Sequence, residues 1–204
     1  VKAAVSAKTY GFGPHGAGAS ETSEEGGDTA FTPDVVMGEG DVVSGEGWTL
    51  RALHTPGHAS NHLCFALEEE RLLFSGDHVM GWSTTVISPP DGNMKAYMAS
   101  LSRLLDRDDA IYLPTHGPAI KEPQRYVRAL MAHRGQRRGG ILNELARGER
   151  TIPEIVAALY AGLDPRLKVA AGRSVLAHLI ELKEMGRVEA SDAAPLEAKY
   201  RLRK

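Results

Sequence analysis

The chain has 204 residues, of which 42% are hydrophobic and 25% are charged, and these are ordinary values for a globular protein. No apolar run approaches the roughly 18 residues of a membrane-spanning helix, so we expect no membrane partner. The single cysteine, Cys64, excludes an internal disulfide and predicts a reducing, cytoplasmic location. Because Cys64 lies in an apolar run, we expect a buried, inert thiol.

The net charge of −2 hides two parts of opposite sign. Residues 1–120 hold 7 Lys and Arg against 16 Asp and Glu, whereas residues 121–204 hold 17 against 10. Such an asymmetry indicates two modules with different partners. We therefore predict one domain over residues 1–120 and a second, basic domain over residues 121–204.

The first module alternates strand and helix patterns. The stretch Val1–Tyr10 is typical of a helix end and a short strand, and the Gly-, Ser- and Glu-rich stretch Gly11–Asp28 predicts a mobile loop. Apolar residues recur at helical spacing over Asn93–Leu105. We expect strands at Asp34–Met37, Trp48–His54, His62–Leu67, Arg71–Ser75 and Ala110–Leu113. Alternating strands and helices predict a layered α/β domain.

The second module is predicted to hold three helices and a terminal hairpin. The first helix is expected over Arg125–Leu145, with a possible break at Gly139-Gly140. Thr151 and Glu154 match the two polar positions of a capping box and predict the start of the second helix. The third helix is expected over Ala170–Met185, ending at Gly186. Val188–Ala190 and Ala198–Leu202 are expected to pair.

Three separated segments carry metal-capable side chains beside a glycine. They are T-P-G-H at residues 55–58, F-S-G-D at residues 74–77 and T-H-G-P at residues 115–118. A glycine after a strand lets the backbone turn sharply and direct one side chain at a shared point. We therefore expect His58, Asp77 and His116 to converge, with their nearest side-chain atoms within about 6 Å because zinc–ligand distances are roughly 2 Å.

Imidazole nitrogens and carboxylate oxygens are ligands that zinc accepts. We predict that His58, Asp77 and His116 are metal ligands in the complete protein, although each segment alone also suits a plain turn. His54 and His62 lie at strand ends, where a structural role or a role orienting a ligand is more typical than direct coordination.

These segments resemble the metallo-β-lactamase superfamily. The resemblance implies an αββα sandwich in which His58 completes one metal site, His116 completes another and the catalytic Asp77 bridges two zinc ions. The family's upstream H-x-H-x-D-H motif is absent, because no two of the eight histidines are separated by one residue. We therefore expect a truncated, partial sandwich that holds few or no zinc ions and is nearly inactive, followed by a small winged-helix-like domain.

The resemblance implies a hydrolase that uses a metal-bound hydroxide. The winged-helix-like domain is similar to that of lactamase-like endoribonucleases and favours an RNA-like phosphodiester. A basic cluster at Arg134, Arg137 and Arg138 is compatible with phosphate binding or with a plain solvated helix face. Alternatives are a small-molecule thioester or acyl hydrolase similar to glyoxalase II, and a non-catalytic nucleic-acid-binding module. The uncovered half-sandwich predicts association with a second copy or aggregation.

A second group of basic residues lies at the end of the chain and carries the same two interpretations, phosphate binding or a solvated tail. Its members are Lys199, Arg201, Arg203 and Lys204.

Overall fold

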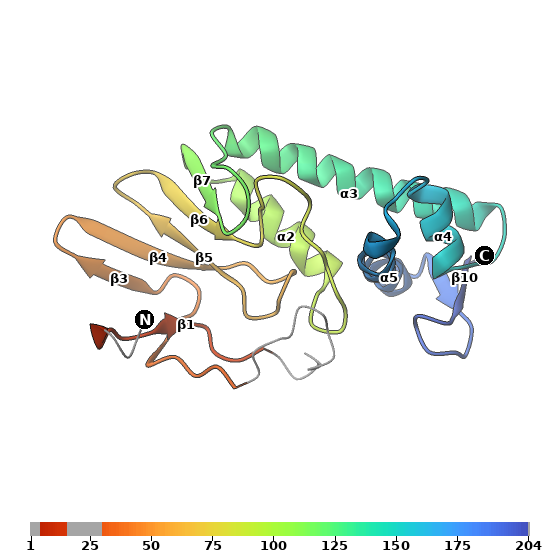
Figure 1. Ribbon diagram of the computed structural model, residues 1–204, viewed down its shortest axis with the longest axis horizontal. Coiled ribbons are helices and arrows are strands. Elements are labelled where there is room, and N and C mark those ends of the chain that lie inside the picture. Colours follow the sequence, from red (N-terminus) through yellow and green to blue (C-terminus); the bar gives the residue numbers. More distant parts are fainter. Residues whose placement is uncertain (1–4, 16–29, 204) are drawn as a thin grey trace.

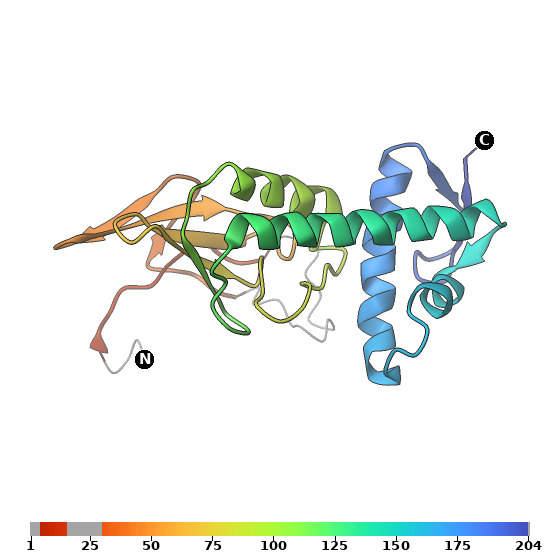
Figure 2. The ribbon, with the colours of Figure 1, turned by 90° about the horizontal axis from the view of Figure 1, so that it is seen from above.

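A computed structural model describes residues 5–15 and 30–203 of the chain. A part built on a sheet and a smaller helical part lie at opposite ends of an elongated molecule, and the long helix α3 (Pro123–Ala146) runs along both (Figures 1 and 2). Among the described residues, no helix combines the length and apolar character that crossing a membrane requires. Most of the predicted mobile loop Gly11–Asp28 lies outside the described residues, so its mobility stays a prediction.

The main sheet has five strands in the order β3-β4-β5-β6-β7. Adjacent strands from β3 to β6 are antiparallel, whereas β6 and β7 are parallel. As a result β4, β6 and β7 run in the same direction, and their carboxyl ends meet at one edge. The strands are β3 (Val42–Gly45), β4 (Trp48–His54), β5 (Leu63–Leu67), β6 (Leu72–Gly76) and β7 (Ile111–Pro114). A separate parallel pair joins β1 (Tyr10–Gly11) and β2 (Val35–Val36).

One face of this sheet is covered by helices. Side chains of successive strand residues point to opposite faces, so Cys64, Leu73 and Tyr112 face the helices and are fully buried. They pack with apolar residues of α2 (Met94–Leu105) and of the first half of α3. Figure 2 shows both helices on the same side of the sheet. This arrangement is a mixed α/β layer, as the sequence predicts.

The smaller part has its own hydrophobic core. Helices α4 and α5 pack with the second half of α3 and with a three-stranded sheet of order β8-β10-β9. The elements are β8 (Arg150–Thr151), α4 (Ile152–Leu159), the 3-10 turn η1 (Pro165–Leu167), α5 (Lys168–Glu184), β9 (Val188–Ala190) and β10 (Lys199–Leu202). The predicted capping box is present, since Thr151 and Glu154 bond each other reciprocally. The predicted winged-helix-like arrangement is confirmed.

Helix α3 differs from its prediction in one respect, because it continues without a break through Gly139 and Gly140. A side-chain carbon at Gly140 would lie 2.7 Å from the Leu159 side chain, so this glycine admits α4 close to the helix backbone. Each glycine costs the helix only about 1 kcal/mol relative to alanine, which this packing offsets. Because α3 contributes to both cores, the boundary between residues 120 and 121 stays a prediction.

Candidate metal centre

The structure brings the three predicted ligands together at the edge where β4, β6 and β7 end. His58 Nε2 lies 4.0 Å from Asp77 Oδ2, and His116 Nε2 lies 3.5 Å from Asp77 Oδ1. The Asp77 carboxylate therefore lies between the two imidazoles, with one oxygen toward each. Two ligands of one tetrahedral zinc ion are about 3.4 Å apart at usual bond lengths, so both separations suit a shared ion.

Glycines next to His58 and Asp77 make these turns possible. Gly57 has φ of 144°, and a side-chain carbon there would lie 2.3 Å from the Cα atom of Tyr97. Gly76 has φ of 55°, and a side-chain carbon there would lie 2.5 Å from Nε2 of His62. Both positions therefore require glycine for backbone conformation and for space. The T-P-G-H and S-G-D patterns thus correspond to real geometric requirements.

The hydrogen bonds of the site leave metal-binding atoms free. Nδ1 of His58 lies 2.8 Å from the carbonyl oxygen of Val86, so this nitrogen carries the proton and donates it. The lone pair then sits on Nε2, the atom that faces Asp77. A carbonyl that accepts from the second ring nitrogen is the usual partner of a metal-binding histidine. Asp77 Oδ1 is buried and has no hydrogen-bond partner among the described residues, which also fits a cation.

The donors present supply only part of a complete coordination sphere. The described residues contain no group of three or more His, Cys, Asp or Glu side chains placed to hold one metal ion. Each imidazole nitrogen is paired with one Asp77 oxygen, whereas zinc usually takes three or four protein ligands. Nitrogen and oxygen donors of this kind fit zinc in chemical type, and further donors would complete the sphere.

His62 lies directly behind Asp77. The Asp77 N–H donates to His62 Nε2 at 3.2 Å, and His62 Nδ1 lies 2.8 Å from the hydroxyl of Thr55. Burial lowers the pKa of His62 to about 4, with smaller contributions from His58 and His54. His62 is therefore neutral and holds the backbone of a predicted ligand, the kind of contact expected of an orienting residue.

His54 lies farther from the three predicted ligands. Its Nε2 is 2.9 Å from the carbonyl of Ser60, in the turn that leads from His58 to β5, and its ring stacks on Phe12 at 4.5 Å. His54 thus braces the turn behind His58 through backbone. Its predicted orienting role, like that of His62, stays a prediction.

Sequence patterns gave no signal for two residues next to the site. Trp82 is 72% exposed, and its indole ring stacks on the His116 ring with the two centroids 6.4 Å apart. Tyr97, which is fully buried in α2, donates its hydroxyl to the carbonyl of His78 at 3.2 Å. An isolated aromatic residue in a loop or on an apolar helix face has no motif around it, and only the fold reveals these contacts.

The three arginines of the predicted phosphate-binding cluster on α3 each contact groups within the protein. Arg134 is only 4% exposed. Arg137 lies over the Tyr160 ring at 4.4 Å and donates to the carbonyl of Leu159. Arg138 lies 3.6 Å from the buried Glu181 carboxylate. Arg134 is thus withdrawn from the surface, whereas Arg137 and Arg138 are partly buried and engaged with neighbouring groups; phosphate binding by this cluster stays a prediction.

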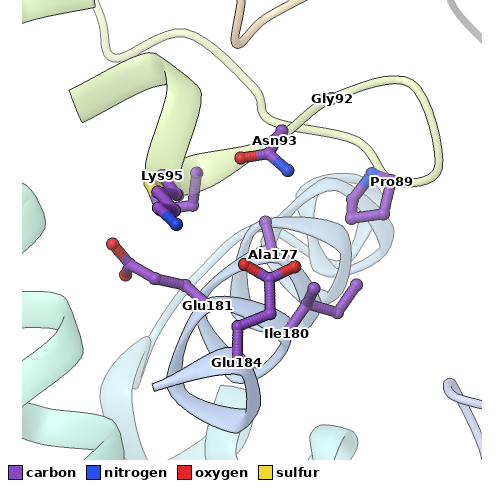
Figure 3. Close-up of a pocket in the computed structure, with 9 residues that line it drawn as sticks. Pro89, Gly92, Asn93, Lys95, Ala177, Ile180, Glu181 and Glu184 are labelled. Carbon is purple, nitrogen blue, oxygen red and sulfur yellow. The ribbon is translucent and has the colours of Figure 1, made fainter. Parts of the chain in front are cut away.

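A small hollow lies between the start of α2 and α5, away from the predicted ligands. Figure 3 shows Lys95 and Asn93 on one side and the carboxylates of Glu181 and Glu184 on the other. Its volume of about 10 Å³ is comparable to the space of one water molecule. The hollow belongs to the contact between the two parts of the molecule, and none of the predicted ligands lines it.

Comparison with known families supports the architecture. Residues 1–116 match the metallo-beta-lactamase superfamily, and residues 151–195 match the beta-lactamase associated winged helix domain. The chain therefore belongs to the metallo-beta-lactamase superfamily. A metallo-beta-lactamase family protein from Thermus thermophilus superposes with a TM-score of 0.74 at 28% identity, covering 88% of this chain and 57% of that one. A beta-lactamase domain protein from Burkholderia ambifaria shares the fold, with a TM-score of 0.75 at 24% identity, covering 86% and 55%.

Curated relatives extend this comparison to named proteins. The lactamase-like protein adaB from Aspergillus niger is 33% identical over 156 residues, which cover 68% of this chain and 48% of adaB. An atrochrysone carboxyl ACP thioesterase from Claviceps purpurea is 34% identical over 134 residues, covering 60% of this chain and 42% of that protein. The chain thus spans about half the length of the curated relatives it matches.

Proposed function

We propose that this chain is part of a metal-dependent hydrolase whose metal centre includes His58, Asp77 and His116, and that its substrate is a thioester. The observation that carries the proposal is the placement of two imidazole Nε2 atoms 4.0 and 3.5 Å from the two oxygens of one carboxylate. Three polar side chains from three strand ends of the main sheet converge there, and all three are of types that bind zinc.

The residues of this chain would hold and orient the metal. His58 and His116 would each provide one nitrogen, and Asp77 would provide its carboxylate oxygens. Zinc bound there would act as a Lewis acid on the scissile carbonyl and make water acidic enough to react near neutral pH. His62 would keep the Asp77 backbone in place by accepting its N–H. We propose two zinc ions for the complete protein, as the family resemblance implies.

A thioester is supported by the relatives and by the surface beside His116. Two relatives that are 34% and 35% identical are named atrochrysone carboxyl ACP thioesterases. The exposed indole of Trp82 offers an apolar platform next to a predicted ligand, which suits the acyl part of such a substrate. Cys64 forms no disulfide, and burial raises the pKa of its thiol to about 12, so we assign it no part in the hydrolysis. A reduced cysteine agrees with the proposed cytoplasmic location.

An RNA-like phosphodiester is the second candidate, and the winged helix domain favours it. Two basic residues of the predicted group near the end of the chain, Lys199 and Arg201, lie on β10 and are exposed. Both already face carboxylates, with Lys199 3.9 Å from Glu149 and Arg201 3.2 Å from Glu189. Burial of Arg134 removes one of the three α3 arginines from phosphate contact, and Arg137 and Arg138 are engaged with Tyr160 and Glu181.

The test compares two proteins. One is the 204-residue chain, and the other, called the longer form below, is the product of the longest reading frame that contains this sequence. Zinc content is measured by mass spectrometry, thioester hydrolysis by release of thiol from acyl-coenzyme A, and RNA cleavage with a fluorescent oligonucleotide. We expect the longer form to bind zinc and release thiol, and the 204-residue form to be metal-poor and nearly inactive. RNA cleavage without thiol release would reject the thioester and favour the second candidate.

Matched variants assign the activity to the site. In the longer form, Asp77→Asn should lower kcat/KM by more than about 100-fold, which is the upper range for residues that merely support a metal ligand. Asp106→Asn makes the same chemical change at the exposed end of α2 and should leave kcat/KM unaltered. Equal activity of the Asp77 variant and the wild type would reject the proposed centre.

A further inference from the structure

A buried arginine of α3 reaches the segment that follows Asp77. We propose that Arg134 is a positioning residue for the metal centre, holding residues 85–86 so that they fix Asp77 on one side and His58 on the other. The inference rests on the proposed function for its consequence, although its geometry is independent of any bound metal. Helix α3, which contributes to both cores, would thereby have a direct role at the predicted metal centre.

The first link joins Arg134 to Thr85 and Tyr97. The Arg134 guanidinium donates to the carbonyl of Thr85, and its central carbon lies 5.3 Å from the centre of the Tyr97 ring. Arg134 and Thr85 are 4% and 2% exposed, and Tyr97 is fully buried. In an environment this dry, a hydrogen bond from a charged donor is strong and directional.

The second link runs from residues 85–86 to both predicted ligands. The Thr85 hydroxyl donates to the backbone carbonyl of Asp77. The next carbonyl, that of Val86, accepts the proton of His58 Nδ1 at 2.8 Å. One two-residue stretch therefore fixes the backbone of the central carboxylate and the ring of a neighbouring histidine. Arg134 holds this stretch from the opposite side.

Core stability alone explains this arginine poorly. A guanidinium loses hydration on burial, and the Arg134 Nε group has no hydrogen-bond partner among the described residues. Replacing a buried charged group by an apolar residue of similar volume is often neutral or stabilising. The contacts that Arg134 does make are directed at the site segment and at the ring beneath it. Its position is explained better by orientation of that segment.

The chain provides a matched control on the same helix. Arg137 also lies over a tyrosine ring, that of Tyr160 at 4.4 Å, and also donates to a backbone carbonyl, that of Leu159. Arg137 also donates to Nε2 of His133 within α3 at 3.3 Å, and these contacts lie on α3, on α4 and on its C-cap residue. Replacing Arg137 by Met therefore removes the same types of interaction as Arg134→Met without touching residues 77–86. A difference between the two variants isolates the positioning role from loss of helix packing.

The first experiment needs no metal. Two-dimensional ¹H–¹⁵N spectra of histidine side chains, recorded on the 204-residue chain at mildly alkaline pH, report which nitrogen of His58 carries the proton. We expect the Nδ1–H tautomer in the wild type and in Arg137→Met. Arg134→Met and Thr85→Val should shift His58 toward a mixture with the Nε2–H tautomer, and Thr85→Ser, which keeps the hydroxyl, should restore the wild-type spectrum.

The second experiment measures cobalt affinity of the longer form through its visible absorption. Arg134→Met and Thr85→Val should weaken cobalt binding by about tenfold, within the range known for residues that support metal ligands, whereas Arg137→Met should change it by less than roughly twofold. If Arg134→Met does not fold, Arg134→Gln, measured in the same two ways, decides.

The two experiments separate the two proposals. An unchanged His58 tautomer in Thr85→Val and in folded Arg134→Met, or an equal loss in Arg137→Met, would overturn the positioning role. Failure of the wild-type longer form to bind cobalt would overturn the proposed metal-dependent function, while the tautomer measurement would still decide on Arg134.

Discussion

The two parts of the molecule complete their cores to different extents. In the smaller part, three helices and a three-stranded sheet surround one apolar cluster that includes Ile155, Leu179 and Tyr200. In the larger part, helices cover one face of the main sheet, while the other face pairs Phe65 with Phe74 and Phe74 with Leu113. Phe74 is 40% exposed, so this second face is incompletely covered by the described residues.

The predicted metal centre lies in the larger part, whose sheet is covered by helices on one face. All three predicted ligands come from the carboxyl ends of strands in the main sheet, where tight turns set their direction. The smaller part instead supplies support, because α3 belongs to both cores and carries Arg134 to the site segment. This contrast indicates that local backbone geometry directs the predicted ligands, whereas long-range packing keeps their surroundings in place.

The largest expected effect tests how strictly the turn before His58 is specified. Gly57→Ala should lower the free energy of unfolding by about 3 kcal/mol or more, because the new carbon meets the α2 backbone at Tyr97 and the φ angle disfavours alanine. Gly47→Ala is the control: its φ is 75° but its surroundings are open, so about 1 kcal/mol is expected. Urea unfolding followed by circular dichroism measures both, and equal losses would contradict the close-approach argument.

The next effect concerns the uncovered sheet face. The 204-residue chain should self-associate through this face, since Phe65, Phe74 and Leu113 form an apolar row. Phe74→Lys should weaken association by about tenfold or more, because a charge would have to be buried at the contact. Sedimentation velocity over a range of concentrations measures this change. Val36→Lys is the control. Val36 is 68% exposed and lies outside the main sheet, so this change should leave association unchanged.

Much of this architecture follows from short local patterns. The capping box at Thr151 and Glu154, and the glycines beside His58 and Asp77, each have a physical requirement that only a few residue types meet. Such requirements can be recognised in the sequence because each involves residues only three or four positions apart. The family resemblance then indicates how the separated segments belong together.

Features that depend on distant packing did not appear in the sequence. Arg134 of α3 has the sequence context of a surface arginine, and only the position of Tyr97 and Thr85 beside it accounts for its burial. Likewise Gly139-Gly140 has the pattern of a helix break, but close approach of Leu159 keeps the helix continuous. The contact of Trp82 with His116 joins two loops and leaves no periodic signal.

A pH-dependent effect is expected where the two parts meet. His178 on α5 is buried, and burial lowers its pKa; Arg134 and Arg138 of α3 act in the same direction and the nearby Glu181 opposes them. His133 of α3 lies near His178, and the pKa of His133 is also lowered, mainly by burial. Below the ordinary pKa of about 6.5, the unfolded chain therefore takes up a proton that folded His178 does not.

Stability should consequently fall as pH decreases below about 6.5, with a slope of at most about 1.4 kcal/mol per pH unit from this residue. His178→Leu should remove that part of the slope, which urea unfolding at several pH values measures. His15→Leu serves as the control because His15 lies outside both cores. The same slope in His178→Leu and in the wild type would show that this imidazole does not resist protonation in the fold.

The smallest effect tests whether the two parts unfold together. Thr151→Ala removes the hydroxyl that accepts from the Glu154 N–H at 3.5 Å and bonds its carboxylate at 2.8 Å. Loss of such a cap costs about 1 kcal/mol. Because α3 contributes to both cores, we expect hydrogen exchange to accelerate in α4 and also, by a similar free energy, in β5 and β6. Thr151→Ser keeps the hydroxyl and should restore protection in all three elements. Faster exchange confined to α4 would show that the smaller part opens independently and that α3 joins the two cores without coupling their stability.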